Sequence, residues 1–217
     1  MRYITKYLLC FLVISFYACL LISSTVLADN SETKTENTLD SKIYYTSVNI
    51  WYESPDKIPS TNYHKGTKLP IGTKVKIISV GNRKIQFIPV DTSHTFTIVH
   101  QRKHTRIKLK ELFDRYFSKK SALAKGGCFH DFTENEKENI KNGGIAPGMS
   151  KVAVIMAYGY PPSHKTPLLS SDLWHYWHSR LQKVIVHFKD NKLYKIESVE
   201  PVLLKLEKEV ESVSRDE

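Results

Sequence analysis

Short stretches of alternating apolar and polar residues dominate the first half of the chain. Runs rich in aromatic and β-branched residues lie at 42–52, 69–80, 83–90 and 95–99, and the second begins with a Pro/Gly turn. A period of two places apolar side chains on one face of a strand. Short strands at about ten-residue spacing are typical of a small barrel or sandwich. The pattern therefore predicts a β domain from residue 43.

A helical period follows these strands. Apolar residues recur at positions i, i+3, i+4, i+7 and i+8, which places them on one helical face. We expect this helix to close the core of the first domain, residues 43–118, through Leu109, Leu112, Phe113, Tyr116 and Phe117.

Residues 119–130 contain a glycine pair and predict a linker between two domains. Thr133 and Glu136 then have the spacing of a capping box, which predicts the start of a short helix. Gly143, in a left-handed conformation, would end that helix.

A second short helix is predicted between Ser150 and Gly159. The Ser150 hydroxyl would cap it, Met149 and Val154 occupy the staple positions, and Gly159 followed by two prolines would end it.

Three runs, at 173–179, 183–190 and 192–198, alternate as strands do, and Asp190-Asn191 predicts a turn between the last two. The second domain, residues 131–200, is thus expected to have the order α-α-β-β-β. Residues 201–217 carry a short heptad stripe, which predicts an amphipathic tail helix that docks on its own domain or on a second copy.

Two parts of the chain resemble known families. Gly148-Met149-Ser150-Lys151, Tyr158-Gly159-Tyr160-Pro161, Trp174, Tyr176 and the run "VIVHFKDNKLYKI" resemble the small domain of the BamE (SmpA/OmlA) outer-membrane lipoproteins, over about residues 133–198. The resemblance implies a two-layer α+β fold and non-catalytic protein–protein contact at the envelope. The run "PIGTKVKI" is similar to a recurrent motif of bacterial SH3-like barrels. The preceding β domain departs from the simple BamE lipoproteins.

Residues 1–28 have the pattern of a signal peptide. Arg2 and Lys6 precede an uncharged stretch, and Val26-Leu27-Ala28 fits a cleavage site before Asp29. An uncleaved anchor and lipid attachment at Cys19 are the alternatives. Residues 29–42 are polar and predict a flexible spacer.

Composition limits the partners that we expect. The formal charge is +10, and removal of Arg2 and Lys6 with the leader would leave +8. A basic exported chain favours an envelope protein partner, an anionic polymer or a membrane surface, and it disfavours nucleic acid. The mature chain would retain Cys128 alone, and so no internal disulfide.

The segment "HQRKHTRIKLK" is densely basic. One hypothesis is an anion-binding site formed by Arg102, His104, Arg106 and Lys108. The alternative, which we favour here, is the solvated face of a strand, because these residues alternate with others.

No motif in the sequence indicates an enzyme, a cofactor or a metal site. His175 and His178 would point to opposite faces of one strand, so they cannot both ligate one ion from it. A pairing of His175 with His187 across the hairpin would depend on its register. Cys128 lies near His130, but without a nucleophile signature a linker cysteine is the simpler interpretation.

Aromatic residues give the partner-binding hypothesis. Trp174 and Tyr176 would pack on the helices, whereas His175 and Trp177 would face the other side of the sheet. With Tyr160, these two form the predicted partner site. The sequence thus indicates a non-catalytic exported scaffold of the periplasm or outer membrane. The alternative is a cell-wall-binding accessory or hydrolase that uses the SH3-like domain.

Overall fold

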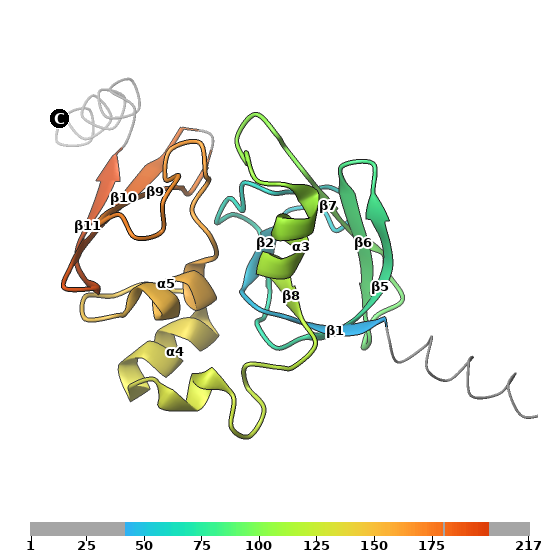
Figure 1. The fold of residues 1–217 in the computed structure, drawn as a ribbon, viewed down its shortest axis with the longest axis horizontal. Helices are drawn as coiled ribbons and strands as arrows, with labels where there is room; N and C mark the ends of the chain where they lie inside the picture. Colours follow the sequence, from blue (N-terminus) through green and yellow to red (C-terminus); the bar gives the residue numbers. More distant parts are fainter. Residues whose placement is uncertain (1–41, 180, 200–217) are drawn as a thin grey trace, which may run out of the picture. The chain divides into compact units, whose positions relative to one another are not determined.

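Alternating buried and exposed side chains fold the first half of the chain into a curled sheet. The computed structural model describes residues 42–179 and 181–199. Its six-stranded sheet has the order β3-β7-β6-β5-β1-β8, antiparallel except between β3 and β7, and curls into a half-barrel (Figure 1). The strands are β1 (Ile43–Thr46), β3 (Ile58–Pro59), β5 (Lys74–Gly81), β6 (Lys84–Pro89), β7 (Phe96–Val99) and β8 (Phe117–Ser118).

Each of the four predicted runs contains a strand, whereas β3 and β8 were not predicted. A separate pair joins β2 (Ile50–Tyr52) to β4 (Thr67–Leu69). The two-residue strands β3 and β8 are too short to show a period. Helix α3 (Leu109–Tyr116) packs against the sheet through buried Leu112 and Tyr116, so the predicted closing helix is confirmed. Phe117 was wrongly assigned to this helix, because its backbone is extended and it begins β8.

The basic segment before α3 is not a strand, so the predicted strand was wrong, although Arg102, Arg106 and Lys108 are exposed as a solvated face requires. Residues 100–108 form turns instead, in which the N–H groups of His104 and Thr105 both donate to the carbonyl oxygen of Gln101. Ser60 fixes this loop, because its hydroxyl accepts from the Gln101 N–H and donates to the Thr105 hydroxyl. These hydrogen bonds to a distant serine take the place of the strand-to-strand hydrogen bonds that the alternation predicted.

The second half of the chain has the predicted order α-α-β-β-β. Helices α4 (Glu134–Asn142) and α5 (Lys151–Tyr158) precede the sheet β11-β10-β9, made of β9 (Leu173–Trp177), β10 (Lys183–Lys189) and β11 (Lys192–Val199). Trp174 and Tyr176 are buried with the helix residues in a second hydrophobic cluster. The coarse prediction of a mixed α+β fold is confirmed.

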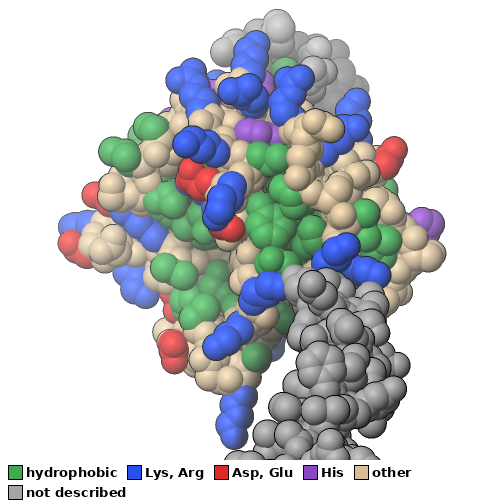
Figure 2. Space-filling view, turned by 45° about the vertical axis from the view of Figure 1, so that its right-hand side comes forward, with side chains coloured by type: hydrophobic (Ala, Val, Ile, Leu, Met, Phe, Trp, Pro, Cys, Tyr) green, Lys and Arg blue, Asp and Glu red, His purple; other side chains and the backbone are tan. Residues whose placement is uncertain are grey.

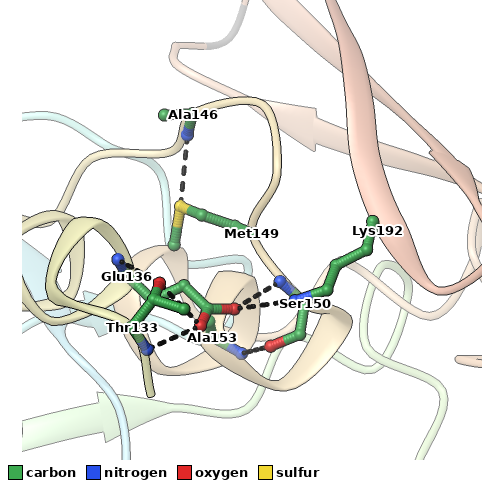
Figure 3. A network of polar contacts seen from close by, with 7 residues as sticks. All are labelled: Thr133, Glu136, Ala146, Met149, Ser150, Ala153 and Lys192. Carbon is green, nitrogen blue, oxygen red and sulfur yellow. Dashed lines mark hydrogen bonds and ion pairs between the residues drawn. The ribbon is translucent and has the colours of Figure 1, made fainter.

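The two helices begin at one shared carboxylate. Glu136 and Thr133 form the predicted capping box, and the Glu136 carboxylate also accepts the Ser150 N–H at 2.7 Å (Figure 3). Lys192 of β11 lies 3.5 Å from the same carboxylate. Burial alone would raise the pKa of Glu136, but the hydrogen bonds from Ser150 and Thr133 outweigh burial and lower it to about 2.

The two helices end at one shared asparagine. Asn49, fully buried between β1 and β2, donates through Nδ2 to the carbonyl oxygens of Ile140 at 2.7 Å and Ala157 at 2.9 Å. Its Oδ1 accepts the Ile71 N–H, and its own N–H donates to the Met156 carbonyl. The last carbonyls of a helix lack partners within the helix. Asn49 supplies those partners from the β-rich segment, residues 43–118.

Further bonds complete the carbonyl ends of both helices. The Tyr158 carbonyl accepts from Asn62 Nδ2 at 3.2 Å and from the His64 ring at 2.5 Å, and Lys68 donates to the Lys141 carbonyl. We call the three residues Asn49, Asn62 and His64 the polar seam. They join the β-rich segment to the helix–sheet segment, residues 131–199.

The expected linker contributes to packing. Phe129, in the 3₁₀ turn Cys128–Asp131, is buried in the second hydrophobic cluster, while Cys128 is exposed. The described residues from Ile43 onward group into one compact unit. The division into separate domains at 43–118 and 131–200 stays a prediction, and the polar seam argues against separate unfolding of the two.

Other predictions concern parts of the chain outside the described residues. These are the leader at 1–28, the spacer at 29–42 except for Lys42, and the tail helix at 201–217. Within residues 42–179 and 181–199, no helix has both the length and the apolar character needed to span a bilayer.

Asn49→Ala should destabilise the fold by about 3 kcal/mol or more, because it leaves three buried backbone groups without a partner. Urea unfolding followed by tryptophan fluorescence and by circular dichroism measures the loss. Asn142→Ala, an exposed change at the end of α4, is the matched control and should have little effect. Similar losses for the two variants would contradict the role of Asn49.

Glu136→Gln should change how stability depends on pH. The folded-state pKa of Glu136, about 2, lies below its ordinary 4.5, so its contribution is complete above pH 4.5 and is lost as pH falls towards 2. That difference corresponds to about 3 kcal/mol. The variant should lose part of this stability at pH 7. In urea titrations its free energy of unfolding should fall less steeply than that of the wild type as the pH is lowered from 4.5 towards 2. Glu138→Gln, on the exposed side of the same helix, should retain the wild-type pH dependence; an unchanged pH dependence in both would refute the assignment.

Candidate functional site

Two adjoining hollows form a groove lined by aromatic side chains. The larger, of about 830 Å³, is lined by Trp51, Tyr52 and Tyr63, and the smaller, of about 170 Å³, by His164 and Trp177. Tyr63 and His104 line both hollows, so the two hollows adjoin at these residues. We call this surface the aromatic groove and define it by Trp51, Tyr52, Tyr63, His104, His164 and Trp177.

The larger hollow is built by β2 and by the loops around β3. Trp51 and Tyr52 lie on β2, where the Trp51 N–H donates to Asn62 Oδ1 at 3.1 Å. Lys57, Lys65 and Lys103 also line this hollow, together with one carboxylate, Glu53, which pairs with Lys65 at 2.8 Å. The hollow therefore combines aromatic rings with an excess of positive charge.

The smaller hollow joins strand β9 to the loop before α3. The Trp177 ring stacks on the His164 ring, with centroids 5.4 Å apart, and both rings are half-buried. His164 donates through Nδ1 to the His104 carbonyl at 2.9 Å, and the Ser163 hydroxyl accepts the Arg106 N–H. Burial, followed by the charges of neighbouring basic residues, lowers the pKa of His164. Its ring is thus kept neutral beside Trp177.

A buried histidine supports the groove from below. The His64 ring stacks on Tyr158, with centroids 3.4 Å apart, and meets the Trp51 ring edge to face at 5.8 Å. Because Nε2 faces a carbonyl, it must carry the proton. Burial lowers the pKa of His64 to about 4, from 6.5. The neutral ring therefore stabilises the fold above pH 6.5, and this contribution is lost as pH falls towards 4.

The structure separates the three predicted partner-site residues. Trp177 lies in the aromatic groove, on the sheet face opposite Trp174, as the strand period predicts. His175 is half-buried on the same face as Trp177; burial first, and then nearby positive charges, lower its pKa. Tyr160 packs instead against the hydrophobic core of the β-rich segment, and its ring lies 4.8 Å from the guanidinium of Arg115.

The predicted anion-binding residues also divide between two places. Arg102, Arg106 and Lys108 line a hollow of about 510 Å³, which Arg83 joins from the turn between β5 and β6. The His104 ring instead contacts the His164 ring and lines the aromatic groove. We call the first surface the arginine pocket, lined by Arg83, His100, Arg102, Thr105, Arg106 and Lys108.

Sequence reasoning missed Trp51, Tyr63 and Arg83. The pattern places Trp51 in a predicted strand, and its alternation with Ile50 is the signal that marks it as an aromatic on the other face. Tyr63 and Arg83 lie in loops, where no period marks a contact, and the fold alone brings them to these surfaces.

The histidines do not gather into a metal centre in the part of the chain that is described. His175 pairs with Ile185 and His187 with Leu173, so the two histidines are diagonal neighbours and not direct partners. Among residues 42–179 and 181–199, no three His, Cys, Asp or Glu side chains lie close enough to hold one metal ion.

Comparison with known proteins finds no matching family model, no matching curated protein and no matching solved structure.

Trp174 and Trp177 should differ sharply when each is replaced by alanine. Trp174 is fully buried, so Trp174→Ala should cost about 3–5 kcal/mol through the cavity it leaves. Trp177 is half-buried and loses mainly its stacking on His164, so Trp177→Ala should cost about 1 kcal/mol. Urea denaturation measures both values. Equal losses would mean that Trp177 is a structural residue.

Proposed function

We propose that this chain is a non-catalytic exported protein of the cell envelope that binds a partner protein through the aromatic groove. The observation that carries the proposal is the groove itself, in which rings from β2, β9 and three loops line two adjoining hollows. Tryptophan and tyrosine in such positions concentrate binding energy. The leader pattern at residues 1–28 supports export.

The arrangement of elements supports the two family resemblances. Two helices packed on a three-stranded antiparallel sheet agree with a BamE-like module at residues 131–200, and the curled sheet agrees with an SH3-like origin for residues 43–118. The BamE resemblance implies protein–protein contact in the periplasm or at the outer membrane, which is the activity that we assign to the groove.

The charge of the groove selects the partner. Three lysines and one glutamate line the larger hollow, so an extended acidic segment of a partner protein complements it. Such a segment would lie along Tyr63, which borders both hollows, and reach Trp177. Its binding should weaken as the salt concentration rises.

Photo-crosslinking in intact cells tests the proposal. The full-length protein would carry a photoreactive phenylalanine at Tyr63, or at Val90, an exposed position outside the groove, as the control. A protein that crosslinks from position 63 alone is then purified and titrated with wild type, Trp177→Ala and Val90→Ala. We expect about tenfold or greater weakening with Trp177→Ala and none with Val90→Ala. Crosslinking from both positions, or equal affinity for the two variants, would overturn the proposal.

A cell-wall glycan is the second candidate ligand. The larger hollow belongs wholly to residues 51–104, the segment with the SH3-like motif, which favours this alternative. Crosslinked products that contain cell-wall sugars and no protein would select it. Release of soluble fragments from purified cell wall would indicate a hydrolase.

A further inference from the structure

Four cations gather around the arginine pocket without a carboxylate among them. Arg83 comes from the β5–β6 turn, and Arg102, Arg106 and Lys108 come from the loop before α3. No acidic residue lines the pocket of about 510 Å³. Figure 2 shows lysine and arginine side chains predominating over acidic ones on the face that it draws.

The nearest helix does not neutralise this charge. Its carboxylates Glu111 and Asp114 pair with Arg115 and Lys110, each one turn away. In the described part of the chain, none of the four pocket cations forms an ion pair. Cations held near one another repel, so a bound anion would stabilise this arrangement.

The loop that carries these cations is held from below. Thr105 and His100 are buried, and the His100 ring donates from Nε2 to the Thr105 carbonyl at 2.9 Å. The Thr105 hydroxyl accepts from Ser60 at 2.9 Å. The His100 N–H donates to the Arg83 carbonyl at 2.8 Å, which ties the loop to the β5–β6 turn. The cations are therefore presented by a preorganised backbone.

Arg83 occupies a backbone conformation that its side chain disfavours. Asn82 and Arg83 have φ of 48° and 60°, in the left-handed region that a tight hairpin turn requires at both central positions. Asparagine tolerates this region, whereas glycine is preferred at the position of Arg83. Strained positions of this kind gather at functional sites.

We propose that the arginine pocket binds a phosphate group, with the guanidinium groups of Arg83, Arg102 and Arg106 donating to its oxygens. Guanidinium forks match phosphate geometry and bind it through paired hydrogen bonds. Three such forks offer more donors than the two oxygens of a carboxylate can accept, and this favours phosphate over an acidic side chain. The phosphate group is either a free anion or part of a lipid headgroup. This site is separate from the aromatic groove and does not depend on the partner proposed for it.

Titration of the full-length protein with inorganic phosphate, at constant ionic strength, tests the proposal, and vesicles test the source. One vesicle set contains phosphatidylglycerol, and the other contains phosphatidylcholine alone. The variants are Arg102→Gln/Arg106→Gln and, with the same loss of charge, Lys120→Gln/Lys125→Gln as the control. We expect the arginine pair to weaken binding about tenfold or more, and the lysine pair to leave it unchanged. Saturable binding of inorganic phosphate identifies the free anion, and binding only to phosphatidylglycerol vesicles identifies the headgroup.

Arg83→Gly separates binding from folding. Glycine relieves the left-handed strain, so the melting temperature should rise while binding of the same probe weakens about tenfold. Equal losses of binding from the arginine and lysine pairs would show a diffuse charge effect and overturn the proposal. Absence of binding to both inorganic phosphate and phosphatidylglycerol vesicles would overturn it as well, as would full binding by Arg83→Gly.

Discussion

The side chain of Asn49 satisfies three buried backbone groups that belong to three different parts of the chain. Its amide nitrogen reaches the last turns of α4 and α5, and its oxygen holds the Ile71 N–H. Buried backbone groups without a partner are costly, so the sheet and the helices depend on each other at this point. Asn62 and His64 extend the same dependence to Tyr158. The C-terminal end of each helix therefore depends on hydrogen bonds between the two segments.

The same constraint positions the aromatic groove. His64 is fixed by the Tyr158 carbonyl below and lies against the Trp51 ring, which lines the larger hollow. Trp177, at the other end of the groove, lies on β9 and stacks on His164, which is bonded to the loop of the β-rich segment. The groove therefore contains residues from both segments. A change that weakened the polar seam would also separate the residues that form the proposed binding surface.

Features set by neighbours within four residues could be predicted from the sequence. The capping box at Thr133 and Glu136, the left-handed Gly143 and the cap at Ser150 all follow from local spacing, and so does the opposite orientation of Trp174 and Trp177. The hydrogen bonds of Asn49 span 91 and 108 residues, so no local pattern announces them. Residues 100–108 were misassigned for the same reason: alternating charges suggested a strand, while Ser60, 45 residues before Thr105, sets the turns. Arg83 joined the arginine pocket through the hairpin turn, which sequence spacing alone does not relate to the loop.

Native-state hydrogen exchange of the full chain tests most directly whether the seam makes one cooperative unit. β10 is the central strand of its sheet and β6 is one of the inner strands of the other, so their amides report the opening of the two segments separately. If the seam couples the segments, the slowest amides of both strands should exchange through one global opening, with free energies within about 0.5 kcal/mol of each other. A β10 opening free energy that lies well below that of β6, by about 2 kcal/mol or more, would show that the helix–sheet segment unfolds alone and would contradict the account.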